Sequence, residues 1–192
     1  MKTQALTLIS LLTSLAVTLR LLKHAIVGSF QFINIPLCFV FFSSYYFGFR
    51  IASIIGILTF IISDLFLGIG IWSVTNSIIV AILSLCIVCI RKIKSKTYLF
   101  VSFYLLSLAY DITSSLILYI IFGINFYTAL IFSIIGLFMP IQGGYVIGIG
   151  PLTEISTSLI TIFMIYGVEK RIKIKEIFLK TPSQINEPKS SK

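Results

Sequence analysis

Long apolar runs alternate along this chain with short polar or glycine-containing segments. A membrane-spanning helix needs about 20 mostly apolar residues, within a range of roughly 17–25. Runs of this length predict six spans, which cover residues 4–22, 33–49, 51–67, 73–90, 98–122 and 150–167. The pattern therefore predicts an all-α integral membrane protein with six transmembrane helices.

A further apolar stretch, residues 124–139, precedes the last predicted span and ends at Pro140. The glycine-rich segment that follows breaks any helix. Irregular backbone at membrane depth is tolerated only where protein buries it or where it lines a cavity. We therefore expect a re-entrant or partial helical segment here, and a seventh full span is the alternative.

Composition excludes the soluble classes of protein. Hydrophobic residues make up 58% of the 192 residues, charged residues only 11%, and the mean hydropathy is +1.08. A soluble domain of this size needs more polar side chains to cover its exterior. A soluble enzyme or a nucleic-acid-binding protein is therefore excluded, despite the net charge of +9.

The positions of the basic residues predict the topology. Six spans with both termini in the cytoplasm place 13 of the 15 basic residues inside and only Arg20 and Lys23 outside. Seven spans would leave six inside and nine outside, so the six-span topology is favoured. We expect residues 1–175 to form one membrane domain in the cell membrane. Residues 176–192 are predicted to form a polar, disordered cytoplasmic tail.

The sequence carries no recognisable catalytic machinery. His24 is the only histidine, and Cys86 and Cys89 lie in an apolar run without further cysteines in a loop. No nucleotide-binding P-loop is present, so ATP-driven work would need another chain. We therefore expect a protein that is not an enzyme and that binds neither a metal nor a cofactor.

Three carboxylic acids lie within the predicted spans, namely Asp64, Asp111 and Glu154. Ionisable residues at membrane depth are costly and mark functional sites by default. Asp111 and Glu154 each belong to a stripe of hydroxyl residues with helical spacing. The alternative is structural, because serine and threonine often bond to backbone groups within or between membrane helices.

Amides, aromatic rings and glycines gather on the predicted outer side, near these acids. Trp72 and Asn76 begin the fourth span, and Gln142 and Tyr145 lie in the glycine-rich segment before the last span. The two rings could belong to the aromatic belt at the membrane interface, or they could be walls of a pocket. Together these groups predict a pocket that is open to the outside.

The first predicted span carries a strip of small residues, Ser10, Ser14 and Thr18, spaced four apart. Such strips let helices approach closely. The strip is explained either by packing within the chain or by docking on a partner membrane subunit.

The chain resembles the substrate-binding S component of energy-coupling factor (ECF) transporters. The stretches that carry the resemblance are residues 33–37 (INIPL), 46–50 (YFGFR), 63–65 (SDL) and 70–73 (GIWS), followed by the basic loop that ends the fourth span. Such a subunit would bind a vitamin or similar micronutrient from outside. Its partners would be a transmembrane coupling subunit, which Ser10, Ser14 and Thr18 would contact, and two cytoplasmic ATPases.

We expect the substrate to be surrounded by Asn34, Asp64, Trp72, Asn76, Gln142, Tyr145 and Glu154, with Asp111 deeper. For Asp64, this hypothesis predicts that an Asp64→Asn variant binds substrate less tightly but stays folded. Two other functions remain open, namely an autonomous small secondary transporter or channel, and a structural membrane subunit.

Overall fold

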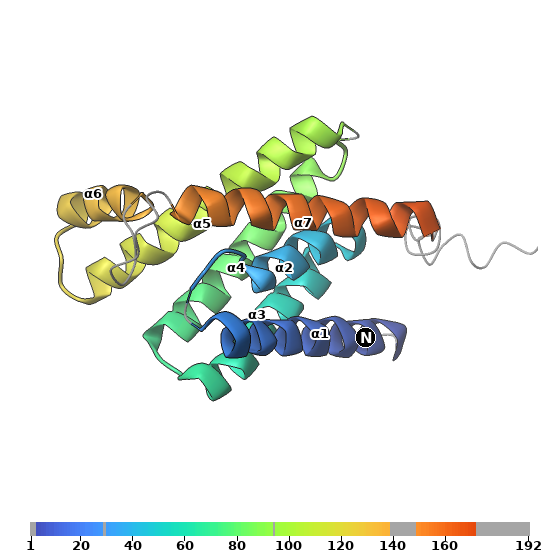
Figure 1. Cartoon of the computed structure of the whole chain (residues 1–192), viewed down its shortest axis with the longest axis horizontal. Coiled ribbons are helices and arrows are strands. Elements are labelled where there is room, and N and C mark those ends of the chain that lie inside the picture. Colours follow the sequence, from blue (N-terminus) through green and yellow to red (C-terminus); the bar gives the residue numbers. More distant parts are fainter. Residues whose placement is uncertain (1–2, 29, 94, 139–148, 172–192) are drawn as a thin grey trace, which may run out of the picture.

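The computed structural model describes residues 3–28, 30–93, 95–138 and 149–171, whose regular structure is entirely helical (Figure 1). The helices are α1 (Thr3–Val27), α2 (Ile35–Phe47), α3 (Phe49–Leu67), α4 (Ile71–Ile90), α5 (Lys96–Ile121), α6 (Phe126–Gly136) and α7 (Ile149–Arg171). The prediction of an all-α protein is confirmed for this part of the chain. The predicted tail, residues 176–192, lies outside the described residues.

Five helices, α1, α3, α4, α5 and α7, are long and apolar enough to cross a membrane. The predicted count of six spans is not confirmed, because α2 has only 13 residues. At 1.5 Å per residue α2 is about 20 Å long, whereas the hydrocarbon core of a bilayer is about 30 Å thick. The second apolar run is thus a short helix, and its neighbours extend beyond it.

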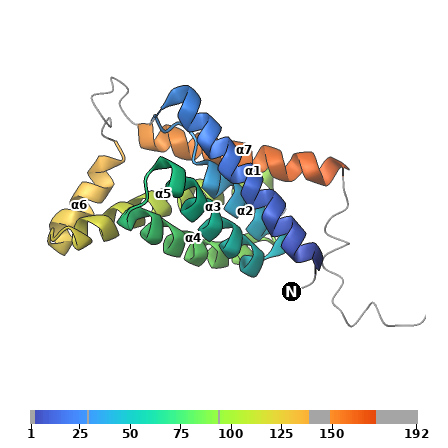
Figure 2. The same ribbon diagram turned by 90° about the horizontal axis from the view of Figure 1, so that it is seen from below.

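Helix α6 occupies the stretch that was expected to be a partial segment. It has 11 residues, too few to cross a bilayer, and Asn125 caps its start by accepting a hydrogen bond from the Thr128 amide at 2.9 Å. In both views α6 lies beside the C-terminal end of α5 (Figures 1 and 2), and its C-cap residue Leu137 approaches Gly150 at the start of α7. The glycine-rich break after Pro140 lies outside the described residues, so a re-entrant path stays a prediction.

The other boundaries follow local signals in the sequence. Helix α2 begins at the cap residue Asn34 with Pro36 in its first turn, and it ends at Gly48, whose φ of +86° disfavours other residues. Helix α1 continues to Val27, five residues beyond the predicted end, because no glycine or proline interrupts it before Gly28. Arg20 and Lys23 therefore lie within a helix and not in a loop.

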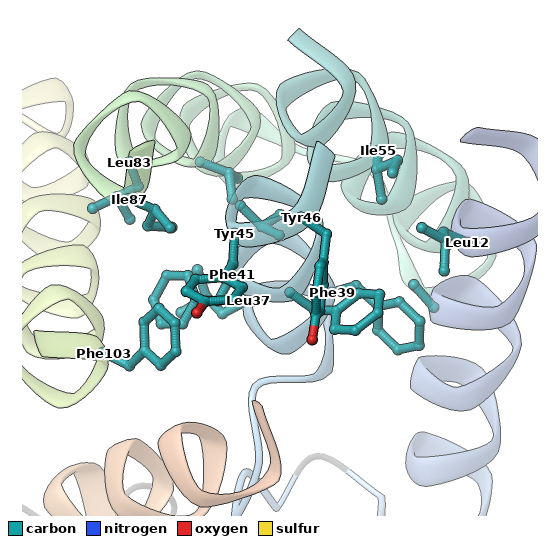
Figure 3. Packing of buried hydrophobic residues seen from close by; sticks show 14 of the residues in the cluster. Leu12, Leu37, Phe39, Phe41, Tyr45, Tyr46, Ile55, Leu83, Ile87 and Phe103 are labelled. Carbon is teal, nitrogen blue, oxygen red and sulfur yellow. The ribbon is translucent and has the colours of Figure 1, made fainter. Parts of the chain in front are cut away.

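Helix α2 is the centre of the structure (Figure 3). It contacts α1, α3, α4 and α7, and every residue from 36 to 46 is buried. On one side the ring of Phe41 stacks on that of Phe103 in α5, with centroids 5.1 Å apart. A helix that is apolar on all faces is stable only when other helices surround it. The longer helices provide that surrounding.

Helices α2, α3 and α4 meet closely at Gly56. A Cβ atom at this position would lie 2.7 Å from a methyl group of Val40 in α2 and 3.3 Å from a methyl group of Val80 in α4. Only glycine leaves room for both side chains. The contact fixes the distance of α3 from the centre of the bundle.

The end of the bundle that contains the N-terminus gathers basic side chains. Arg91 donates hydrogen bonds from Nε to the Tyr45 carbonyl at 2.7 Å and from Nη2 to the Tyr46 carbonyl at 3.1 Å. A cation is favourable at these last carbonyls of α2 because they carry the negative end of the helix dipole. Lys96 lies 4.4 Å from the ring centroid of Tyr166. Both ends of the described chain lie on this side (Figures 1 and 2).

We expect Gly56→Ala to lower the free energy of unfolding by about 1–3 kcal/mol, because the added methyl group overpacks the contact with Val40 and Val80. Thermal unfolding in detergent measures the effect. Gly167→Ala is the matched control, since nothing lies within 4 Å of a Cβ atom there and alanine favours the helix. A Gly56→Ala protein that is as stable as Gly167→Ala would contradict this account of the packing.

Candidate functional site

A polar cavity of about 210 Å³ lies where α1 ends and α2 and α4 begin, at the opposite end from Arg91. Its apolar walls are few, and its polar lining comes from the three helices α1, α4 and α5 and from the segment before α2. These polar residues are Arg20, Lys23, Gln31, Asn34, Asn76, Tyr110, Asp111 and Ser114. So many polar groups inside an apolar bundle are costly unless they bond to one another or to a ligand.

The short length of α2 explains the position of the cavity. Residues 33–36, at the start of α2, line it, while the surrounding helices α1, α3, α4 and α5 contribute residues from their own turns. The cavity therefore occupies space that a longer central helix would fill. The positive end of the α2 dipole lies beside it.

A larger groove of about 530 Å³ runs between α3 and α4, but its lining is almost wholly apolar. Of its ten lining residues only Ser53 and Ser77 are polar. An apolar groove on helices that can cross a membrane is suited to lipid chains, and it offers little to orient a polar ligand. The smaller polar cavity is the candidate site.

An ion pair joins α1 to α3 at one wall of the cavity. A guanidinium nitrogen of Arg20 lies 2.8 Å from Oδ1 of Asp64, whose side chain is only 2% exposed. Arg20 also donates a hydrogen bond to the hydroxyl of Ser63, and its guanidinium lies 5.0 Å from the ring centroid of Phe60. Arg20 therefore lines the cavity, whereas Asp64 lies behind Arg20 and does not line it.

Two buried aromatic rings form the apolar part of the lining. Phe60 of α3 and Tyr110 of α5 stack with their centroids 6.3 Å apart and an interplanar angle of 26°. Both residues line the cavity. Arg20 lies over Phe60, Phe60 stacks on Tyr110, and Tyr110 is followed in the chain by Asp111. The lining therefore contains a cation, two stacked rings and an acid in succession.

Asp111 and Glu154 bring two carboxyl groups together from α5 and α7. Asp111 lines the cavity, and Glu154, which is fully buried, lies close enough behind it for their side chains to interact. Ser107 is another polar neighbour of Glu154. Within the described residues, neither Glu154 oxygen has a hydrogen bond of good geometry. A donor-bearing ligand beside Asp111 would relieve this arrangement.

Asn34 joins the N-terminal end of α2 to α7. Its backbone amide donates to the hydroxyl of Thr157 at 2.9 Å, and its Oδ1 accepts from the amide of Leu37 at 3.3 Å. Nearby, the hydroxyl of Thr153 donates to the carbonyl of Gln31 at 2.5 Å. These bonds fix the segment that closes one side of the cavity.

The structure brings together five of the eight residues that the sequence placed at a substrate. Asn34, Asn76 and Asp111 line the cavity, Glu154 lies behind Asp111, and Asp64 lies behind Arg20. Their role in binding stays a prediction.

Trp72 does not line this cavity, and its predicted stacking role has no support here. It is 46% exposed, and its ring lies over Gly70 at the start of α4. Gln142 and Tyr145 lie outside the described residues.

Sequence reasoning missed Arg20, Lys23, Gln31, Tyr110 and Ser114 as lining residues. The signal for Arg20 and Lys23 was present, because basic residues within a membrane helix are rare and usually pair or line a cavity. Both residues were used only as markers of topology, so their possible place at a cavity was overlooked. Nothing in the local sequence distinguishes Tyr110 from the other aromatic residues of α5.

The strip of Ser10, Ser14 and Thr18 faces away from the bundle. All three residues are exposed, whereas Ile9, Leu12, Thr13, Ala16 and Val17 form the buried face of α1. The strip therefore does not pack within the described part of this chain. Docking on a partner stays a prediction.

Comparison of the chain with protein-family models, with curated proteins and with solved structures finds no match. No group of three or more histidine, cysteine, aspartate or glutamate side chains is placed to hold a metal ion among the residues that the structure describes.

The ion pair changes what is expected of Asp64→Asn. Removing the carboxylate leaves the Arg20 guanidinium partly buried without its partner, so we expect the free energy of unfolding to fall by about 3 kcal/mol. The double variant Arg20→Gln/Asp64→Asn should recover part of this loss. Denaturant or thermal unfolding of the four proteins measures the coupling. Strictly additive effects, or an unchanged Asp64→Asn protein, would contradict the pairing.

Proposed function

We propose that this protein is the membrane-embedded substrate-binding subunit of an ECF-type importer. It would capture a vitamin or a related small organic micronutrient from outside the cell. The observation that carries the proposal is the polar cavity of about 210 Å³ at one end of an otherwise apolar helical bundle. A cavity with a few convergent polar groups is the usual form of a small-molecule site.

The distribution of charge supports the proposed orientation. The described basic side chains other than Arg20 and Lys23 belong to the end of the bundle that holds both ends of the described chain. The positive-inside rule would place that end in the cytoplasm and the cavity toward the outside of the cell membrane. Substrate would then enter the cavity from the side on which nutrients are found.

The exposed face of α1 supports docking on a coupling subunit. Ser10, Ser14 and Thr18 lie on it beside large exposed side chains such as Leu11 and Leu15. Small residues there would let a partner helix approach closely. Two ATPases would supply the energy, because this sequence contains no P-loop of its own.

We expect native mass spectrometry of the detergent-purified protein, alone or after incubation with a panel of vitamins, to show a stoichiometric small-molecule adduct. Asp111→Asn should weaken its affinity at least about tenfold, because a charge-assisted hydrogen bond is lost. Glu169→Gln, an exposed acid on α7, is the matched control and should bind like the wild type. A protein that stays bare with the whole panel would contradict the proposal.

We expect Ser14→Trp to abolish association with a coupling subunit while substrate binding stays unchanged, because the added ring would hold a partner helix away from α1. Co-purification of ATPases with the tagged chain from its native membranes measures the association. Val101→Trp, at an exposed position of α5, is the control. Equal recovery of partners with both variants would place the docking surface elsewhere.

One observation favours a second candidate, a small secondary transporter that acts alone. Asp111 and Glu154 face each other at membrane depth, and paired carboxyl groups can relay protons. The two candidates differ in a single readout. Uptake into liposomes by the purified chain under a pH gradient would favour the second, whereas uptake that requires ATP and partner subunits would favour the first.

A further inference from the structure

The charged groups around the cavity do not neutralise one another completely. Arg20 and Asp64 form the only ion pair in residues 3–28, 30–93, 95–138 and 149–171. This pairing accounts for one cation and one acid. Lys23, half-buried on the cavity wall, and Asp111, with Glu154 behind it, are left without an ionic partner within these residues.

These remaining charges line the cavity from different helices. Lys23 belongs to α1, which packs on α2 and α3, whereas Asp111 belongs to α5, which packs on α4, α6 and α7. Figure 3 shows α1 and α5 on the two sides of α2. A positive group and a negative group thus face the same small space from different helices.

The lining between the two walls is aromatic. The stacked rings of Phe60 and Tyr110 are both buried and both face the cavity. They offer an apolar surface to the middle of a ligand, while their neighbours offer charge to its ends.

We propose that the cavity binds a small zwitterion, with its anionic group at Lys23 and its basic nitrogen at Asp111. The inference rests on the proposed function and names the class of substrate. The positive end of the α2 dipole, at Ile35 and Pro36, adds to the attraction for the anionic group.

A zwitterion is favoured over a singly charged ligand by the cost of leaving a charge unpaired. In a site of low dielectric, a partly buried cation or carboxylate without a partner is strongly unfavourable. A ligand with only a carboxylate would pair with Lys23 and leave the carboxyl groups of Asp111 and Glu154 without a cationic partner. A ligand with only an amine would pair with those carboxyl groups and leave Lys23 unpaired. A molecule with both groups pairs with Lys23 and with Asp111 at the same time.

The volume limits the size of this ligand. A cavity of about 210 Å³ lies below the roughly 300–1,000 Å³ of pockets that hold drug-sized ligands. It suits a small ligand, and a dinucleotide or another large cofactor is too big for it.

The test uses three pools of small molecules that carry different charged groups. The first holds the proteinogenic amino acids with uncharged side chains, the second their N-acetyl derivatives, which lack the cation, and the third their methyl esters, which lack the anion. Native mass spectrometry and thermal shift of the full-length purified protein report binding. We expect an adduct and a raised Tm with the first pool alone.

Two variants then assign the ends of the ligand. Lys23→Gln and Asp111→Asn should each weaken binding of the retained amino acid at least about tenfold. Lys23→Gln should also reduce the preference over the methyl ester, and Asp111→Asn the preference over the N-acetyl derivative. Lys92→Gln and Glu169→Gln, both exposed and at the other end of the bundle, are the charge-matched controls.

The outcomes separate this inference from the function on which it rests. Tight binding of an N-acetyl derivative, a methyl ester or a neutral vitamin overturns the zwitterion and leaves a substrate-binding subunit. Binding of an amino acid that neither Lys23→Gln nor Asp111→Asn weakens overturns the assignment of the two walls. No adduct with any of the pools or with the vitamin panel overturns both proposals.

Discussion

The burial of α2 on every side is the constraint on which the rest of the structure depends. A helix whose residues 36–46 are all buried must be surrounded, and α1, α3, α4 and α7 surround it. Gly56 sets how closely α3 approaches, and Arg91 binds the last carbonyls of α2 at one end. At the other end the neighbours continue beyond Asn34, and the space that α2 does not reach becomes the polar cavity.

The cavity concentrates the charges that an apolar bundle tolerates least. The pairing of Arg20 with Asp64 stabilises the wall between α1 and α3, because each group would be costly alone. Lys23 and the carboxyl groups of Asp111 and Glu154 have no such compensation among the described residues. Groups of this kind reduce stability unless a ligand completes them, which is the usual condition of a binding site before its ligand enters.

The acids show how far local reasoning reaches. Asp64, Asp111 and Glu154 could be selected because ionisable residues at membrane depth are rare, and all three lie in or just behind the cavity. Trp72 was selected for its ring and for its nearness in sequence to Asn76, but its side chain points outward from the start of α4. That Arg20 pairs with Asp64 could not be predicted, because the two residues are 44 positions apart and their pairing depends on how α1 packs against α3.

The sequence by itself determined the all-helical class, the apolar runs of the long helices and the places where glycine or proline ends a helix. These properties depend on hydropathy and on backbone preferences within a few neighbouring residues. Only the tertiary structure decided that the second apolar run is a short helix, buried at the centre of the bundle. It also decided which polar groups meet, because the rotation of each helix about its axis follows from packing against the others and not from its own residues.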